Sequence, residues 1–149
     1  MNKNQGQVSV EFILIVAFFL FVLVPILLIV QFTMASQQAK AQDAKIYEEF
    51  SKLKASIDAV GSIGPISKLA VNLYFPSKVK IGLNNKELSL VYNSLDGRKI
   101  TFLHSSDFDI GFAPSSAQSI PSPEMELKEG KYTLIVQAFT NGKVSLTLN

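Results

Sequence analysis

Cysteine and tryptophan are absent from this chain of 149 residues, and histidine occurs once, at His104. Without cysteine the chain can form neither disulfides nor thiolate metal sites, and its redox compartment cannot be read from the sequence. A Cys-His nucleophile and a multi-histidine metal site are therefore excluded, and no serine shows the elbow motif that accompanies a Ser-His-Asp site. We expect His104 to be a surface or hydrogen-bonded residue at a strand end. We expect no enzyme activity and no cofactor.

Charge of either sign is also sparse. The formal net charge is +2, and the lysines are scattered among acids without forming a basic stripe, so no contact with nucleic acid is expected. Asp107 and Asp109 flank Phe108 and could bind calcium, but the spaced ligands and the glycine of a calcium loop are missing. A solvated strand face is the simpler interpretation, and no metal site is predicted. N-linked glycosylation has no Asn-x-Ser/Thr acceptor in the chain.

The longest uninterrupted feature is an apolar run in the N-terminal part of the chain. Every residue from Phe12 to Val30 is apolar, and no charge follows Glu11 until Lys40. In a helix that rises about 1.5 Å per residue, this run covers the roughly 30 Å of a bilayer core. Glu11 stands at its edge, where an ionisable side chain costs free energy unless it meets solvent or a charged partner. Pro25 removes one helical hydrogen bond inside the run, so we expect a helix kink there.

Five residues at the start of this run have a recognisable spacing: Gly6, Gln7, Ser9, Glu11 and Phe12. Together with the run they resemble the Gln-x-Ser-x-Glu-Phe pattern of the archaeal class III signal peptide, the processing signal of archaeal type IV pilin-like proteins. The resemblance implies that a prepilin peptidase cuts on the cytoplasmic side, between Gly6 and Gln7. It also implies that Glu11 of the mature chain pairs with the amine of Gln7 on the next subunit.

The function implied by the resemblance is that of a structural subunit, a major or minor pilin, of an archaeal type IV pilus-like filament. The precursor would be a single-pass membrane protein with its N-terminus in the cytoplasm, and the mature chain would join a cell-surface filament through its hydrophobic helix. Its partners would be the prepilin peptidase, copies of itself or other pilins, and membrane lipid before assembly. A carboxylate and an ammonium that are each costly in an apolar bundle compensate one another when docked, so such a pair sets the register between helices.

The sequence leaves alternatives open for the orientation of the chain in the membrane and for its cleavage by a peptidase. Lys3 precedes the apolar run and acids follow it, which favours a cytoplasmic N-terminus. The segment Ala39 to Ala41 resembles a small-x-small signal peptidase site, but the apolar run is longer than the roughly 7 to 15 residues of a secretory peptide and ends far from the cut. The chain could also be a single-pass anchored protein that binds an extracellular partner without polymerising, or a secreted domain that begins near Gln42.

Residues 35–62 remain helical in pattern but become amphipathic. Apolar residues recur at spacings of four and three, which is the signature of one helix face; they are Ile46, Phe50, Leu53, Ile57 and Val60. Glu48 and Lys52 stand in the favourable i, i+4 order. Glycine and proline are absent until residues 61–65, where both occur, so we expect one long helix to end there. Its apolar stripe must be buried against a downstream element.

The rest of the chain alternates apolar and polar residues with the period of half-buried strands. The runs are Leu69 to Phe75, Val79 to Leu83, Leu88 to Tyr92, Ile100 to Phe102, Phe108 to Phe112, Tyr132 to Thr140 and Val144 to Leu148. Turns are predicted at 84–85, 96–97 and 141–142, and a Ser- and Pro-rich surface loop at 114–123.

The predicted fold class is α+β: a long N-terminal α-helix, transmembrane in its first half and amphipathic in its second, packed on a C-terminal antiparallel β-sheet or small β-sandwich. We divide the chain into a cleaved leader (1–6), a transmembrane or filament-core helix (7–34), its amphipathic continuation (35–62) and an extracellular β domain (63–149).

Overall fold

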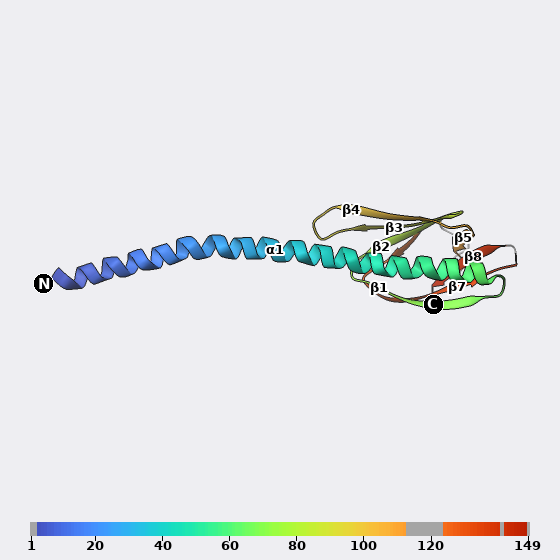
Figure 1. Ribbon diagram of the computed structural model, residues 1–149, viewed down its shortest axis with the longest axis horizontal. Coiled ribbons are helices and arrows are strands. Elements are labelled where there is room, and N and C mark those ends of the chain that lie inside the picture. The colour runs from blue at the N-terminus through green and yellow to red at the C-terminus, as the bar shows by residue number, and fades with distance from the viewer. Residues whose placement is uncertain (1–2, 113–123, 141, 149) are drawn as a thin grey trace. The chain divides into compact units, whose positions relative to one another are not determined.

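The computed structural model describes residues 3–112, 124–140 and 142–148, and it describes side chains from Val10 onward. One long helix, α1 (Lys3–Ile63), precedes all the strands in these residues (Figure 1). The strands are β1 (Lys68–Phe75), β2 (Val79–Asn84), β3 (Glu87–Asn93), β4 (Lys99–Ser105), β5 (Asp109–Phe112), β6 (Glu124–Leu127), β7 (Gly130–Ala138) and β8 (Lys143–Leu148). The chain divides into two compact units, residues 1–38 and residues 39–149, and α1 contributes to both.

In the first unit every described residue is helical. A helix satisfies its backbone hydrogen bonds internally, which is the condition for placing a backbone in an apolar medium. The helix continues without a break through Pro25. The kink expected at Pro25 stays a prediction.

The part of α1 that belongs to the second unit buries the predicted apolar stripe. The side chains of Ile46, Leu53 and Ile57 are completely buried. After Ile63 the helix is ended by Gly64, whose φ of 97° is accessible to glycine at little cost. The hydroxyl of Ser67 donates to the carbonyl oxygens of Val60 (2.8 Å) and Gly64 (2.7 Å), which satisfies acceptors at the helix end.

The first sheet has the strand order β1-β7-β8-β5. β7 pairs antiparallel with β1 on one side and with β8 on the other. β5 pairs with β8 in parallel, from Asp109 opposite Lys143 to Phe112 opposite Leu146. The expectation of an antiparallel sheet is therefore wrong for this strand. Period-two alternation reports which residues face the core, but it carries no information on strand direction.

The second sheet has the order β4-β3-β2-β6 and is antiparallel throughout. Asn85, with a φ of 52°, and Gly97, with a φ of 84°, form the tight turns between β2 and β3 and between β3 and β4, as predicted. β6 was not expected from the sequence. It is a short edge strand in which Met125 and Leu127 alternate with two glutamates, a pattern too brief to stand out.

One hydrophobic core holds α1 and the two sheets of the second unit together. It combines the apolar stripe of α1 with the inner faces of both sheets, including Phe75 and Val136 from the first sheet and Leu90 from the second. The α+β fold, with the helix packed against C-terminal sheets, is thus confirmed. The predicted loop 114–123 and Asn141 of the last predicted turn lie outside the described residues.

Candidate functional site

The residues of the predicted processing motif lie in the first turns of α1. The backbone of residues 3–9 is helical, so Gly6, Gln7 and Ser9 belong to the same helix as Glu11 and Phe12. Gln7 and Glu11 are one helical turn apart, since positions i and i+4 are neighbours on one face. The side chains of Glu11 and Phe12 are both exposed.

From Phe12 to Val30 the surface of α1 is apolar around its whole circumference, and the apolar residues Phe32 and Met34 follow among polar ones. Its large apolar side chains are exposed, among them Phe21 with 79% of its surface accessible and Phe32 with 74%. The helix is long and apolar enough to cross a membrane, and nothing in the described part of the chain buries its apolar window. Such a continuous apolar surface requires lipid or other helices around it, because water solvates it poorly. The helix is compatible with a membrane anchor.

His104 lies within β4, and its Nε2 is 3.3 Å from Oδ1 of Asp58 on α1. The histidine therefore links the edge strand of the second sheet to the helix. It is the last residue but one of β4, so the hydrogen-bonded residue expected at a strand end is found. Asp107 and Asp109 are both exposed, and only Asp109 belongs to β5. Among the described residues, no group of three or more His, Asp or Glu side chains could hold a metal ion.

A charged cluster on α1 was only partly foreseen. The predicted pair of Glu48 and Lys52 is present, with Nζ and Oε1 2.9 Å apart. The neighbouring Glu49 is also part of the cluster: 97% of its surface is buried, and its Oε1 lies 3.1 Å from Nζ of Lys52 and 3.4 Å from Nζ of Lys45. Its Oε2 is buried without a hydrogen-bond partner in the described residues. The burial of Glu49 could have been predicted from its position, because it lies three residues after Ile46 and so falls on the apolar stripe.

Residues of β3 and of the β3–β4 turn contact α1 at Asp43, near the point where the helix enters the second unit. The hydroxyl of Tyr92 donates to Oδ1 of Asp43 at 3.0 Å, and Arg98 reaches Oδ2 of the same carboxylate at 3.9 Å. Burial raises the pKa of Tyr92, and its hydrogen bond to Asp43 raises it further. Within the turn, the hydrogen bond from the backbone N–H of Arg98 lowers the pKa of Asp96.

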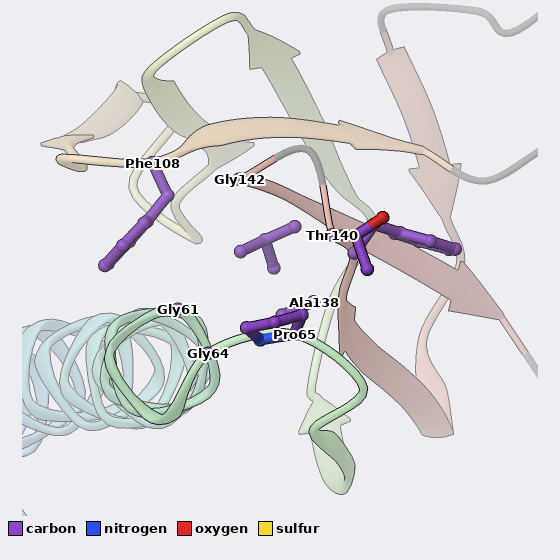
Figure 2. A pocket seen from close by; sticks show the side chains of 9 residues that line it. Gly61, Gly64, Pro65, Phe108, Ala138, Thr140 and Gly142 are labelled. Carbon is purple, nitrogen blue, oxygen red and sulfur yellow. The ribbon is translucent and has the colours of Figure 1, made fainter.

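An open apolar pocket lies at the other end of this unit, where α1 stops (Figure 2). It has a volume of about 170 Å³ and is lined by Gly61, Gly64, Pro65, Phe108, Ala138, Phe139, Thr140, Gly142 and Val144. Figure 2 shows the Phe108 side chain pointing toward the helix at Gly61. A Cβ atom on Gly61 would lie 2.3 Å from Cδ2 of Phe108, so only glycine leaves room for this ring. This pocket could not be predicted from the sequence, because its walls come from segments far apart in the chain.

No protein-family model matches the chain, and neither the curated proteins nor the solved structures that were compared with it include a match.

Proposed function

We propose that this chain is a structural subunit of an archaeal type IV pilus-like surface filament. The observation that carries the proposal is the first half of α1: an exposed, wholly apolar helix surface that begins beside a single carboxylate, Glu11. It is supported by the resemblance of residues 6–12 to the class III processing signal. A plain lipid anchor explains the apolar surface, but it requires neither the motif nor a carboxylate at the edge of the run.

Removal of the leader would give the carboxylate of Glu11 a partner of opposite charge. A cut between Gly6 and Gln7 creates an ammonium group one helical turn from Glu11. In an apolar bundle both charges would be costly alone, whereas an ammonium from a neighbouring copy compensates the carboxylate. We propose that this pair between copies sets the axial register of the helices. The apolar contacts of residues 12–30 supply the association, and the second unit is displayed on the outside of the filament.

The route to the filament follows from the same features. The precursor is inserted as a single-pass protein with Lys3 and the leader in the cytoplasm, where a prepilin peptidase removes residues 1–6. The competing signal peptidase cut near Ala41 is disfavoured, because the structure is helical there and Ala39, which would be lost, is buried in the second unit. The mature chain then leaves the bilayer as it joins other copies.

The experiment that tests the proposal is the mass of the N-terminal peptide of the protein recovered from cells of its source. We expect a chain that starts at Gln7, recovered from surface filaments visible by electron microscopy. A chain that starts at Met1 would make it an anchored membrane protein that does not polymerise. A chain that starts near Gln42 would make it a secreted domain, and either result would overturn the proposal.

A further inference from the structure

We infer that one face of α1 is the surface by which neighbouring copies of this chain pack together, each copy displaced along the helix by half a heptad from the next. The face, which we call the seam, consists of Leu14, Phe18, Phe21, Pro25, Leu28 and Phe32. The inference rests on the proposed function, because it names the helix face and the displacement that assembly uses.

The seam follows a strict heptad pattern. Its residues recur at alternating spacings of four and three, and Glu11 precedes Leu14 by three residues in the same pattern. In a continuous helix this period keeps one narrow face turned toward a neighbouring helix. A helix surrounded by lipid alone needs no such period, because lipid tails solvate every side alike.

The seam also differs from the rest of the apolar surface in its side chains. Phe18, Phe21 and Phe32 are the three most exposed large apolar residues between positions 10 and 34, at 67%, 79% and 74%. None of the valines and isoleucines of residues 12–30 lies on the seam. The seam therefore projects long side chains that can act as knobs between helices, whereas the stiff β-branched residues lie on the other sides.

A second stripe with the same spacing contains Phe12 and Phe19, so aromatic residues alone do not select the seam. Glu11 distinguishes the two stripes, because it continues the seam. In an apolar surrounding, a carboxylate that faces lipid stays uncompensated, whereas one that faces a neighbouring copy can meet an opposite charge. The occupant of the seam is therefore a second copy of this chain.

The charge of Glu11 also fixes the displacement between copies. Chains inserted into one membrane with the same orientation are parallel. Parallel seams in level register place Glu11 beside Glu11 of the neighbour, where two like charges repel. A displacement of half a heptad, about 3.5 residues or roughly 5 Å, instead places Glu11 beside position 7 of the next copy. Under the proposed function, that position carries the ammonium group left by removal of the leader.

The sizes of the seam residues agree with the same displacement. In level register Phe21 meets Phe21 and Pro25 meets Pro25, so large and small groups each face their own kind. After displacement by half a heptad, Phe21 of one copy faces Pro25 of the next, and Leu28 faces Phe32. Alternation of larger and smaller groups lets the two surfaces interdigitate. A displacement with the same sense at every contact cannot close as a two-fold dimer does, so its repetition builds an open array.

Cysteine cross-linking between two kinds of chain tests the seam and the displacement, because the chain has no cysteine of its own. We would express Leu28→Cys in one copy of the full chain and Phe32→Cys in a second, epitope-tagged copy, in the same cells. The matched control is Ile26→Cys with Val30→Cys, which has the same spacing on the stripe of Phe19. Membranes and surface filaments are treated with a membrane-permeant oxidant. Non-reducing electrophoresis then measures the disulfide-linked dimers between tagged and untagged chains.

We expect the test pair to give mixed dimers at least about tenfold more abundant than the control pair, because facing cysteines have a high effective concentration. The mixed dimers should also exceed the dimers of Leu28→Cys with itself, which report level register. Filaments in which the mixed dimers do not exceed the control would overturn the seam. Filaments in which Leu28→Cys pairs best with itself would overturn the displacement.

A second measurement does not depend on cysteine. Phe21→Ala should reduce the filament mass sheared from cells, normalised to processed protein in membranes, more than Phe19→Ala does, because it removes a packed ring from the seam. Equal losses from the two variants would overturn the seam. If the wild-type chain forms no filaments, the proposed function fails by itself. Mixed dimers above the control in membranes then retain the seam, and their absence overturns both.

Discussion

Gly61 on α1 lies directly against the ring of Phe108, in the segment that leads into β5. The aromatic ring occupies the space that a side chain at Gly61 would need, and it forms one wall of the apolar pocket. Neither residue could be connected with the other from the sequence, because forty-seven positions separate them, and Gly61 reads locally as a helix breaker. The glycine is required by packing, since its φ is not among the positive values.

We predict that Gly61→Ala destabilises the second unit by about 1 to 3 kcal/mol, because the new methyl group overpacks the contact with Phe108. The effect opposes the ordinary helix preference for alanine over glycine. The measurement is denaturant unfolding of the detergent-solubilised full chain, followed by tyrosine fluorescence, with the exposed Ser62→Ala as a control. In a Phe108→Ala background the loss should shrink; equal losses in both backgrounds would remove this explanation.

Tyr92 is the residue at which stability and pH are coupled. Because its pKa is raised in the folded protein, the neutral phenol is favoured there, and its stabilising contribution is fully present below the ordinary tyrosine pKa of 10.0. It is lost as the pH rises toward the raised value. We predict that the wild-type chain loses stability more steeply than Tyr92→Phe does as the pH rises above about 10. Parallel pH profiles for the two proteins would contradict the prediction.

At the scale of elements, α1 shows how one helix serves two environments. Its first half exposes apolar residues on every side, whereas its second half confines them to a stripe buried in the core. The change in pattern after residue 34 was readable from the sequence, and so were seven of the eight strands, because each follows an unambiguous period. The parallel pairing of β5 was not readable, since strand partners are chosen by tertiary packing. The burial of Glu49 was also missed, because a glutamate flanked by charges reads as exposed.

Glu49 supports a prediction about α1 as an element. Replacing a buried, lysine-paired carboxylate by an apolar residue of similar size is often neutral, whereas removal of its partners leaves a buried charge uncompensated. We predict that Glu49→Met stays within about 1 kcal/mol of the wild-type free energy of unfolding. Lys45→Ala combined with Lys52→Ala should lower the free energy of unfolding by more than Glu49→Met does, because it leaves the buried carboxylate without a counter-charge. Chemical denaturation measures both, with the exposed Lys54→Ala as control. A larger loss in Glu49→Met than in the double variant would refute the argument.

At the scale of the whole molecule, processing and assembly can be separated. Under the proposed function, the peptidase cuts between Gly6 and Gln7, whereas Glu11 pairs with the neighbouring copy. Variants at these two places should therefore fail at different steps, and a simple membrane anchor would show neither failure.

Replacing Gly6 by leucine should block leader removal and leave membrane insertion intact, because the bulky side chain obstructs the peptidase without altering the apolar run. The readout is the electrophoretic shift and the N-terminal mass of the membrane-extracted protein. We expect the rate of leader removal to fall by more than about 90%, which raises the activation free energy of cleavage by about 1.4 kcal/mol or more. Asn4→Leu, a leader change outside the motif, should be processed normally. Unaltered processing of the Gly6 variant would count heavily against a pilin.

Glu11→Ala should be processed normally yet assemble poorly, because the ammonium of the next copy loses its counter-charge and the register between helices is no longer fixed. Filament mass sheared from cells, normalised to processed protein in membranes, should fall by about tenfold or more, which corresponds to about 1.4 kcal/mol per contact. Glu11→Asp keeps the charge and should recover part of the yield. Normal filaments from Glu11→Ala would remove the pairing argument.

The central place of β7 in the first sheet has a consequence for the timing of synthesis. Lys68 of β1 is paired with Gln137 of β7, so β1 cannot pair until β7 has been translated. At roughly 5 to 20 residues per second, that delay lasts several seconds. The β2–β3–β4 meander can pair during this interval, but the edge of β1 stays open to other chains. A ribosome that stalls before Gly130 would leave a nascent chain prone to aggregation, so the cell's holding factors are needed most in that interval.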